Sequence, residues 1–149
     1  MSSLLSSMLV LHVIIGLSGL IALHLAYMQL IRRTPPYTLI IKAAWVSVVL
    51  LFVSWVTGAY YYVVHYGTAV KPRILASGYP WAHSFFMEAK EHVFILMPFL
   101  VIIFALGAHT LRRAENPMLK RALTFLGAFV LILGIFITAS GIIISGAVR

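Results

Sequence analysis

The chain has 149 residues, of which 62% are hydrophobic and only 9% are charged, and its formal net charge is +8. A soluble domain usually carries about 25% charged residues, so this composition excludes a water-exposed globular surface and indicates a surface that faces lipid. The sequence contains no cysteine, which excludes disulfides, thiolate metal sites and haem attached through Cys-x-x-Cys-His.

The first apolar run spans about Met8–Ile31. A transmembrane helix takes roughly 20 residues, so this run is long enough to cross a bilayer. No basic segment precedes the run, and we therefore interpret it as a retained helix rather than a cleaved signal peptide. It carries His12 near its start and His24 further along, and it ends at the pair Arg32-Arg33.

The second run, about Leu39–Val64, predicts a second transmembrane helix. We expect residues 65–90 to form a long loop after it, because Gly67 and Pro72 are typical breakers. The later part of this loop, "AHSFFMEAKEH", predicts a short helix that runs into the third span. The loop also gathers imidazoles and carboxylates, which copper or zinc could bind: His65, His83, Glu88 and Glu91. The same groups could instead accept protons from a quinol, or form a solvated ion-pair cluster with neighbouring lysines and arginines.

The third and fourth runs, about His92–Leu111 and Ala122–Ala147, complete a set of four predicted helices. Their polarity does not alternate, which favours helices over a membrane barrel. Glycines at every seventh position of the fourth run predict a smooth face for helix packing or for a neighbouring subunit. The expected fold is a single domain, residues 1–149: an all-α integral membrane bundle of four up-down helices, read as two repeated hairpins.

Most of the positive charge lies beside the two short loops, because seven of the eleven basic residues flank them. The positive-inside rule then places these loops in the cytoplasm and both termini outside, and we expect a prokaryotic cytoplasmic membrane. This placement argues against nucleic acid as a partner and favours anionic lipid headgroups of the bilayer.

The repeat brings two histidines into register. Shifting the chain by 80 residues places His12-Val13 on His92-Val93, and Arg32-Arg33 on Arg112-Arg113. Twenty residues of helix span about 30 Å, so His12 and His92 are expected at one depth, near the outer edge of the hydrocarbon layer. The first and third helices of an up-down bundle are diagonal, and two imidazoles facing each other across the axis could ligate a haem iron. The same pair could also sit idle at the interface.

A second haem would require His24 and His109 as ligands near the cytoplasmic side. Counted from the arginine pairs, the depths of these two residues differ by about 7 Å. His109 also has a simple interpretation as a polar residue at the inner interface.

With four apolar helices and these histidines, the chain resembles membrane b-type cytochromes, although it has no diagnostic motif. The resemblance implies haem b as the cofactor, and a role in passing electrons between a quinol and a partner redox protein as a subunit of a larger complex. Two alternatives stay open. One is a cofactor-free accessory subunit of a membrane complex, and the other is an outward-facing copper or zinc binding membrane protein.

Overall fold

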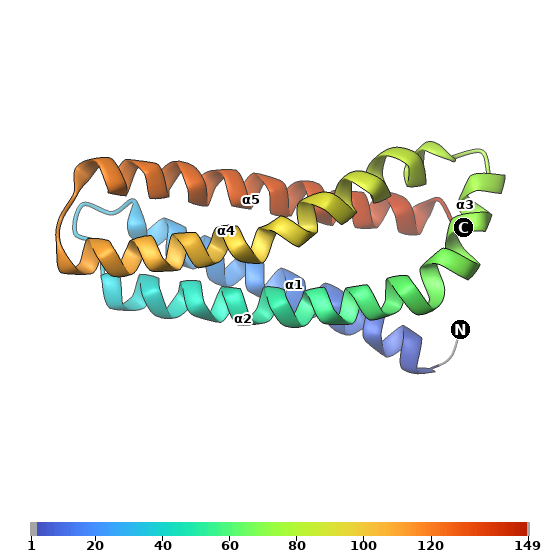
Figure 1. Ribbon diagram of the computed structural model, residues 1–149, viewed down its shortest axis with the longest axis horizontal. Coiled ribbons are helices and arrows are strands. Elements are labelled where there is room, and N and C mark those ends of the chain that lie inside the picture. The colour runs from blue at the N-terminus through green and yellow to red at the C-terminus, as the bar shows by residue number, and fades with distance from the viewer. Residues whose placement is uncertain (1–2, 149) are drawn as a thin grey trace.

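The computed structural model describes residues 3–148, and its regular structure is entirely helical over that range. The main helices are α1 (Ser3–Leu30), α2 (Tyr37–Tyr61), α4 (Glu88–Arg113) and α5 (Pro117–Gly146) (Figure 1). With their extensions, they give four helices that are long and apolar enough to cross a membrane. The predicted all-α bundle of four helices is therefore confirmed, and the chain is an integral membrane protein.

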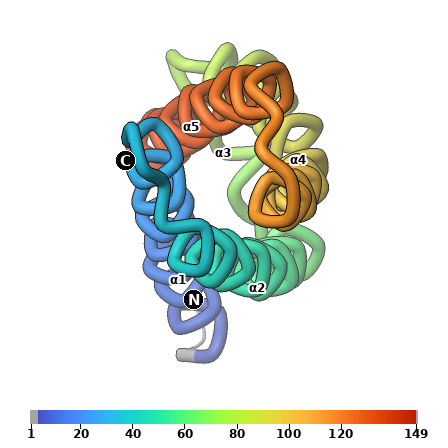
Figure 2. Tube along the Cα trace, turned by 90° about the vertical axis from the view of Figure 1, so that its left-hand side faces the viewer, coloured from blue at the N-terminus to red at the C-terminus, as the bar shows by residue number. Residues whose placement is uncertain are grey.

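The four helices follow one another around a ring in the order α1, α2, α4, α5 (Figure 2). Helices α1 and α4 both pack on α2 and on α5, so they occupy diagonal positions, as the sequence predicts. Both described chain ends lie at the same end of the bundle as residues 62–87, which we call the terminal end (Figure 1). The opposite end, formed by the turns at residues 31–36 and 114–116, is the hairpin end.

The terminal end differs from the predicted loop at residues 65–90. Helix α2 continues through a π-helical segment, η1 (Tyr62–Val70), into α3 (Lys71–Ala76), and a second π-helical segment, η2 (Ala82–Met87), leads into α4. Only residues 77–80 lie outside a helix here. The proline expected to break the chain, Pro72, is the second residue of α3, directly after the π-helical segment, and the helix continues through it. The helix expected at "AHSFFMEAKEH" is confirmed by η2 and the start of α4.

The main core lies toward the hairpin end of the bundle. Its largest fully buried side chains come from α1, α2 and α4: Leu23, Leu30, Ile40, Phe104, Met97 and Leu111. The predicted small-residue face of α5 packs within the chain itself, because side chains of α1 lie against Gly127 and Gly134. A β-carbon at Gly134 would lie 2.5 Å from Leu20, so these glycines let the two helices approach closely.

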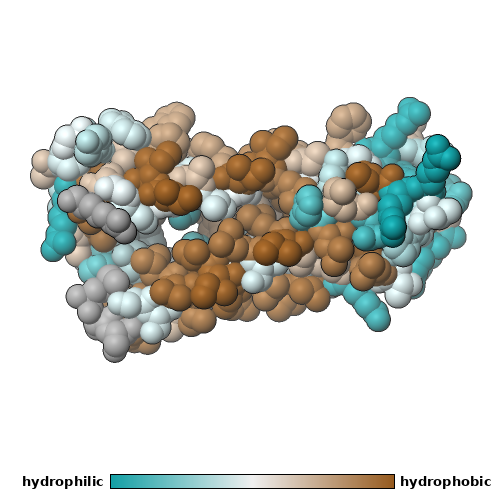
Figure 3. All heavy atoms as spheres, turned by 180° about the vertical axis from the view of Figure 1, so that it is seen from behind, coloured by the Kyte–Doolittle hydropathy of each residue, from teal (hydrophilic) through white to brown (hydrophobic). Residues whose placement is uncertain are grey.

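Helix α1 is poorly covered toward the terminal end. Residues 4–18 contribute no buried side chain, whereas four residues between Gly19 and Leu30 are buried. The space-filling view shows an opening between this half of α1 and α5, near the chain ends (Figure 3). Much of the middle of the molecule is hydrophobic on that side, and hydrophilic atoms gather at the hairpin end (Figure 3). The bundle is therefore tight at the hairpin end and open at the terminal end.

Candidate functional site

His12 is interlocked with Ser54 where α1 crosses α2. The His12 Nδ1 atom lies 2.8 Å from the main-chain carbonyl oxygen of Ser54, and the Ser54 hydroxyl donates to the carbonyl oxygen of His12 at 2.9 Å. A carbonyl oxygen can only accept a hydrogen bond, so Nδ1 carries the proton and donates it. In the neutral ring the other nitrogen, Nε2, therefore keeps a free lone pair.

Two glycines make room for this contact. A β-carbon at Gly58 would lie 2.6 Å from the His12 Nδ1 atom, and one at Gly16 would lie 2.8 Å from the Ser54 hydroxyl. Both distances are shorter than real β-carbon contacts, so any larger residue would displace one of the two partners. Gly16 and Gly58 thus hold α1 and α2 close enough for the hydrogen bonds, and the imidazole has little freedom to turn.

The ring of His12 faces α4 through Phe94. The two rings pack edge to face with centroids 5.5 Å apart, and Lys90, one turn earlier on α4, interacts electrostatically with the imidazole. A β-carbon at Gly141 would lie 3.5 Å from the Lys90 Nζ atom, so this ammonium also lies against α5. The side chains that α4 presents to His12 are therefore Phe94 and Lys90.

His92 is not brought to His12. It is exposed, and its Nδ1 atom donates to the carbonyl oxygen of Glu88 at 2.7 Å, within its own helix. Residues two positions apart on a helix point about 200° from each other. Because Phe94 faces His12, His92 is directed away from it. The expected pair of facing imidazoles is absent from this arrangement of the described helices.

The two histidines expected nearer the hairpin end also lie in different surroundings. His24 is exposed on α1, and His109 is half-buried on α4. The buried core between these helices is occupied by side chains such as Leu23 and Phe104. Buried side chains of the main core therefore lie between the helices that carry the two histidines.

A second polar contact lies at the terminal end, between Tyr66 of η1 and His83 of η2. The Tyr66 hydroxyl is 3.0 Å from the His83 Nδ1 atom, and the two residues are 2% and 3% exposed. Tyr66 belongs to a small apolar cluster with Ile74, Ala82 and Ile144. This hydrogen bond joins the segments on either side of residues 77–80, so it fixes the fold of the terminal end.

Glu91 borders this cluster. Its carboxylate interacts with the phenol groups of Tyr62 and Tyr66, and with the adjacent Lys90. One carboxylate oxygen, Oε1, is buried and has no hydrogen-bond partner among the described residues. A buried carboxylate oxygen without a hydrogen-bond partner is costly to maintain, so this side chain is a candidate ligand or proton site. Glu91 is therefore the acidic side chain of most interest at this end.

The four expected copper or zinc ligands do not form one site. Among residues 3–148, no three histidine, cysteine, aspartate or glutamate side chains are placed to hold a metal ion together. His83 is buried against Tyr66, Glu88 is exposed, and His65 packs its ring against Tyr61. Because this region is helical rather than a loop, its candidate ligands point in different directions around the helices.

We expect Tyr66→Phe to loosen the terminal end. The change leaves the buried His83 nitrogen without its partner, and an unsatisfied buried polar group costs roughly 1–3 kcal/mol. Hydrogen exchange of residues 62–87, followed by mass spectrometry in detergent, should become faster. Tyr60→Phe is the matched control, because Tyr60 is 43% exposed. Equal exchange in the two variants would contradict a structural role for the Tyr66–His83 bond.

Several residues of these contacts were not expected from the sequence. Ser54 is one polar residue in an apolar run. The only sequence feature that could have indicated a close helix contact there is Gly58, one turn later. Tyr66 resembles its neighbours in an interfacial aromatic belt, but it is almost fully buried. Lys90 lies against α5 and close to His12, a placement that the sequence did not indicate.

Comparison with protein-family models, with curated proteins and with solved structures finds no match for this chain. Its function is therefore inferred from its own residues and their contacts.

Proposed function

We propose that this protein is a membrane electron-transfer subunit that binds a b-type haem through His12. The observation that carries the proposal is the hydrogen bond from His12 Nδ1 to the Ser54 carbonyl. Metal-ligating histidines almost always donate their second ring nitrogen to a carbonyl, a carboxylate or a water, which fixes the ring and leaves the other nitrogen to the metal. The space that Gly16 and Gly58 provide supports the same role, because it holds the ring in one orientation.

The proposal assigns one haem rather than two, and one ligand from this chain. His92 would have to turn about half a helical revolution to meet His12, and His24 and His109 are separated by packed core. A haem held by His12 alone would be high-spin, whereas a haem held by two imidazoles would be low-spin. The electronic spectrum therefore distinguishes the proposed arrangement from the paired one.

The polar residues of the terminal end could accept the protons of a quinol, the proposed electron donor. A quinol that loses two electrons also releases two protons, which need acceptors near the site of oxidation. The unpartnered oxygen of Glu91 and the Tyr66–His83 pair are candidate acceptors. A haem held by His12 would supply the one-electron chemistry, and a partner redox protein of the same complex would be its electron acceptor.

The basic residues of the hairpin end support the proposed orientation of the protein in the membrane. Under the positive-inside rule this end faces the cytoplasm of a prokaryotic cell, and the terminal end faces the other side of the membrane. The proposed haem and quinol sites then lie on the outer side, at the opposite end from the arginine pairs.

An absorption spectrum tests the haem proposal. Protein purified in detergent and supplied with haem is expected to show a Soret band that shifts on reduction, with one haem per chain. His12→Ala should abolish the band, while His24→Ala, the matched exposed-histidine control on the same helix, should retain it. We expect His92→Ala to retain it as well. A colourless wild-type protein, or a full Soret band in His12→Ala, would refute the proposal.

A cofactor-free accessory subunit is the second candidate, and the opening beside α1 favours it. Residues 4–18 of α1 bury no side chain in the isolated chain, so a helix of another subunit could cover them. In that case the His12–Ser54 bond would serve only to join α1 and α2. The purified protein would then be colourless and would co-purify with a larger membrane complex.

A further inference from the structure

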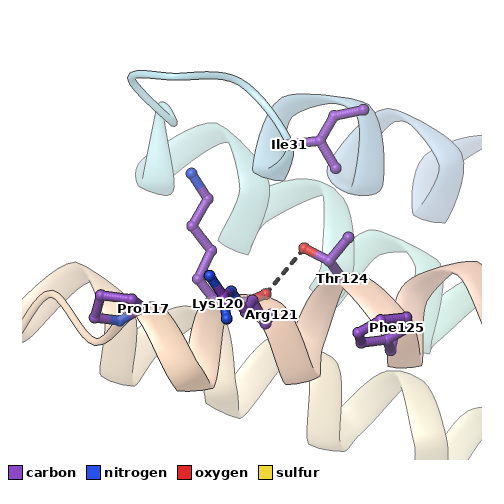
Figure 4. Close-up of a pocket in the computed structure, with 6 residues that line it drawn as sticks. All are labelled: Ile31, Pro117, Lys120, Arg121, Thr124 and Phe125. Atoms are coloured by element: carbon purple, nitrogen blue, oxygen red, sulfur yellow. Dashed lines mark hydrogen bonds between the residues drawn. The ribbon is translucent and has the colours of Figure 1, made fainter.

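A groove at the hairpin end lies where α1 ends and α5 begins. Its volume is about 660 Å³, and it is lined by Ile31, Pro117, Lys120, Arg121, Thr124 and Phe125. Figure 4 shows Ile31, just past the end of α1, across from Thr124 on α5, with Lys120 rising from α5 toward the turn that follows α1. None of the candidate haem, quinol or metal residues lines this groove.

The upper edge of the groove is basic. Lys120 donates from Nζ to the carbonyl oxygen of Arg32 at 3.0 Å, which holds the ammonium between the two helices. An ammonium has three donors, so this hydrogen bond leaves capacity for an anion. Arg121 follows Lys120 and is exposed, and the residues lining the groove include no carboxylate. The edge therefore attracts a negatively charged group.

The floor of the groove is apolar and continues onto the lipid-facing surface. Phe125 is 76% exposed and Ile31 is 45% exposed, although both are large hydrophobic residues. Further along α5, Phe129 and Ile132 extend this surface toward the middle of the membrane. Thr124 does not interrupt it, because its hydroxyl donates to the carbonyl oxygen of Lys120 at 2.9 Å. A ligand with an anionic head and long apolar chains would match both parts.

We infer that this groove is a specific binding site for one anionic phospholipid. The phosphate lies between Lys120 and Arg121, and an acyl chain follows Ile31 and Phe125 down the seam between α1 and α5. Inorganic phosphate would match only the basic edge. Basic recesses between transmembrane helices at the headgroup level are suited to this class of ligand.

The test counts the lipid bound to detergent-solubilised protein by native mass spectrometry during a titration with phosphatidylglycerol. One lipid per chain should bind before any others, and phosphatidylcholine should bind more weakly. Each basic residue near a headgroup contributes about 1 kcal/mol, so Lys120→Gln with Arg121→Gln should weaken binding roughly 25-fold. The control, Lys42→Gln with Arg113→Gln, removes two exposed charges that do not line the groove, and should leave the affinity nearly unchanged.

Loss of the hydrogen bond from Lys120 to Arg32 could itself disturb the fold, so a variant that keeps Lys120 is also needed. Arg121→Gln alone should weaken phosphatidylglycerol binding roughly 5-fold. Equal binding of phosphatidylcholine and phosphatidylglycerol would overturn the inference, as would an equal loss of affinity in the control pair. Displacement of the lipid by an equal concentration of inorganic phosphate would also overturn it, since the groove would then be a phosphate site. The haem spectrum has no bearing on any of these outcomes.

Discussion

Replacing Gly58 by alanine is expected to destabilise the bundle by roughly 1–3 kcal/mol, the usual cost of inserting a group into a well-packed contact. The added methyl carbon would lie 2.6 Å from the His12 Nδ1 atom, so the imidazole must move and its hydrogen bond to Ser54 must lengthen or break. Alanine is otherwise the better helix former, by about 1 kcal/mol, so a loss of stability must come from the clash. Unfolding in detergent with increasing denaturant measures the change.

The second half of this experiment is a double-mutant cycle with His12→Ala. Removing the imidazole removes the atom that the new methyl group would meet, so Gly58→Ala should cost little in a His12→Ala background. The expected coupling lies within the 0.5–3 kcal/mol seen for residues in contact. Additive effects of the two changes would mean that Gly58 does not hold the ring of His12. If haem binds, Gly58→Ala alone should also weaken the Soret band.

Gly127→Ala is expected to separate α5 from two of its neighbours at once. The new methyl carbon would lie 2.9 Å from the ring of Tyr27 on α1 and 3.0 Å from the ring of Phe104 on α4. Aromatic rings are rigid, and Phe104 is fully buried, so its ring cannot move aside without displacing other core residues. A loss of roughly 1–3 kcal/mol in the free energy of unfolding should result.

Gly146→Ala provides the matched control for this change. Gly146 belongs to the same helix, as its last residue, but a β-carbon there would meet nothing within 4 Å. This variant should therefore be as stable as the wild type or slightly more so. Equal stabilities of the two variants would show that the close packing of α1 and α4 on α5 contributes little to the fold.

The transmembrane spans and their order could be predicted because apolar length and the arginine pairs are direct signals. The rotation of each helix about its own axis could not. In a bilayer the outside of a bundle is as apolar as its inside, so α1 has no polar face to indicate which side turns inward. This explains why the sequence did not indicate that His92 points away from His12, or that Ser54 is the hydrogen-bond partner of His12.

The terminal end was mispredicted for a different reason. Gly67 and Pro72 are typical helix breakers, but Gly67 lies within the π-helical segment η1 and Pro72 at the start of α3, because the tertiary structure overrides their local preference. The buried pair of Tyr66 and His83 is a tertiary contact between segments 17 residues apart, and no local pattern indicates it. The groove beside Lys120 likewise depends on how α1 and α5 meet.

The unbroken helix from Tyr37 to Ala76 has 40 residues. At 1.5 Å per residue a straight helix of this length would measure about 60 Å, twice the hydrocarbon thickness of a bilayer. Up to about half of such a helix would lie beyond the hydrocarbon layer, on the far side from the arginine pairs. Residues 77–80 form the tip of this projection. A protease site or epitope inserted there would be reachable from one aqueous compartment only, and so would reveal which way the protein is oriented in the cell.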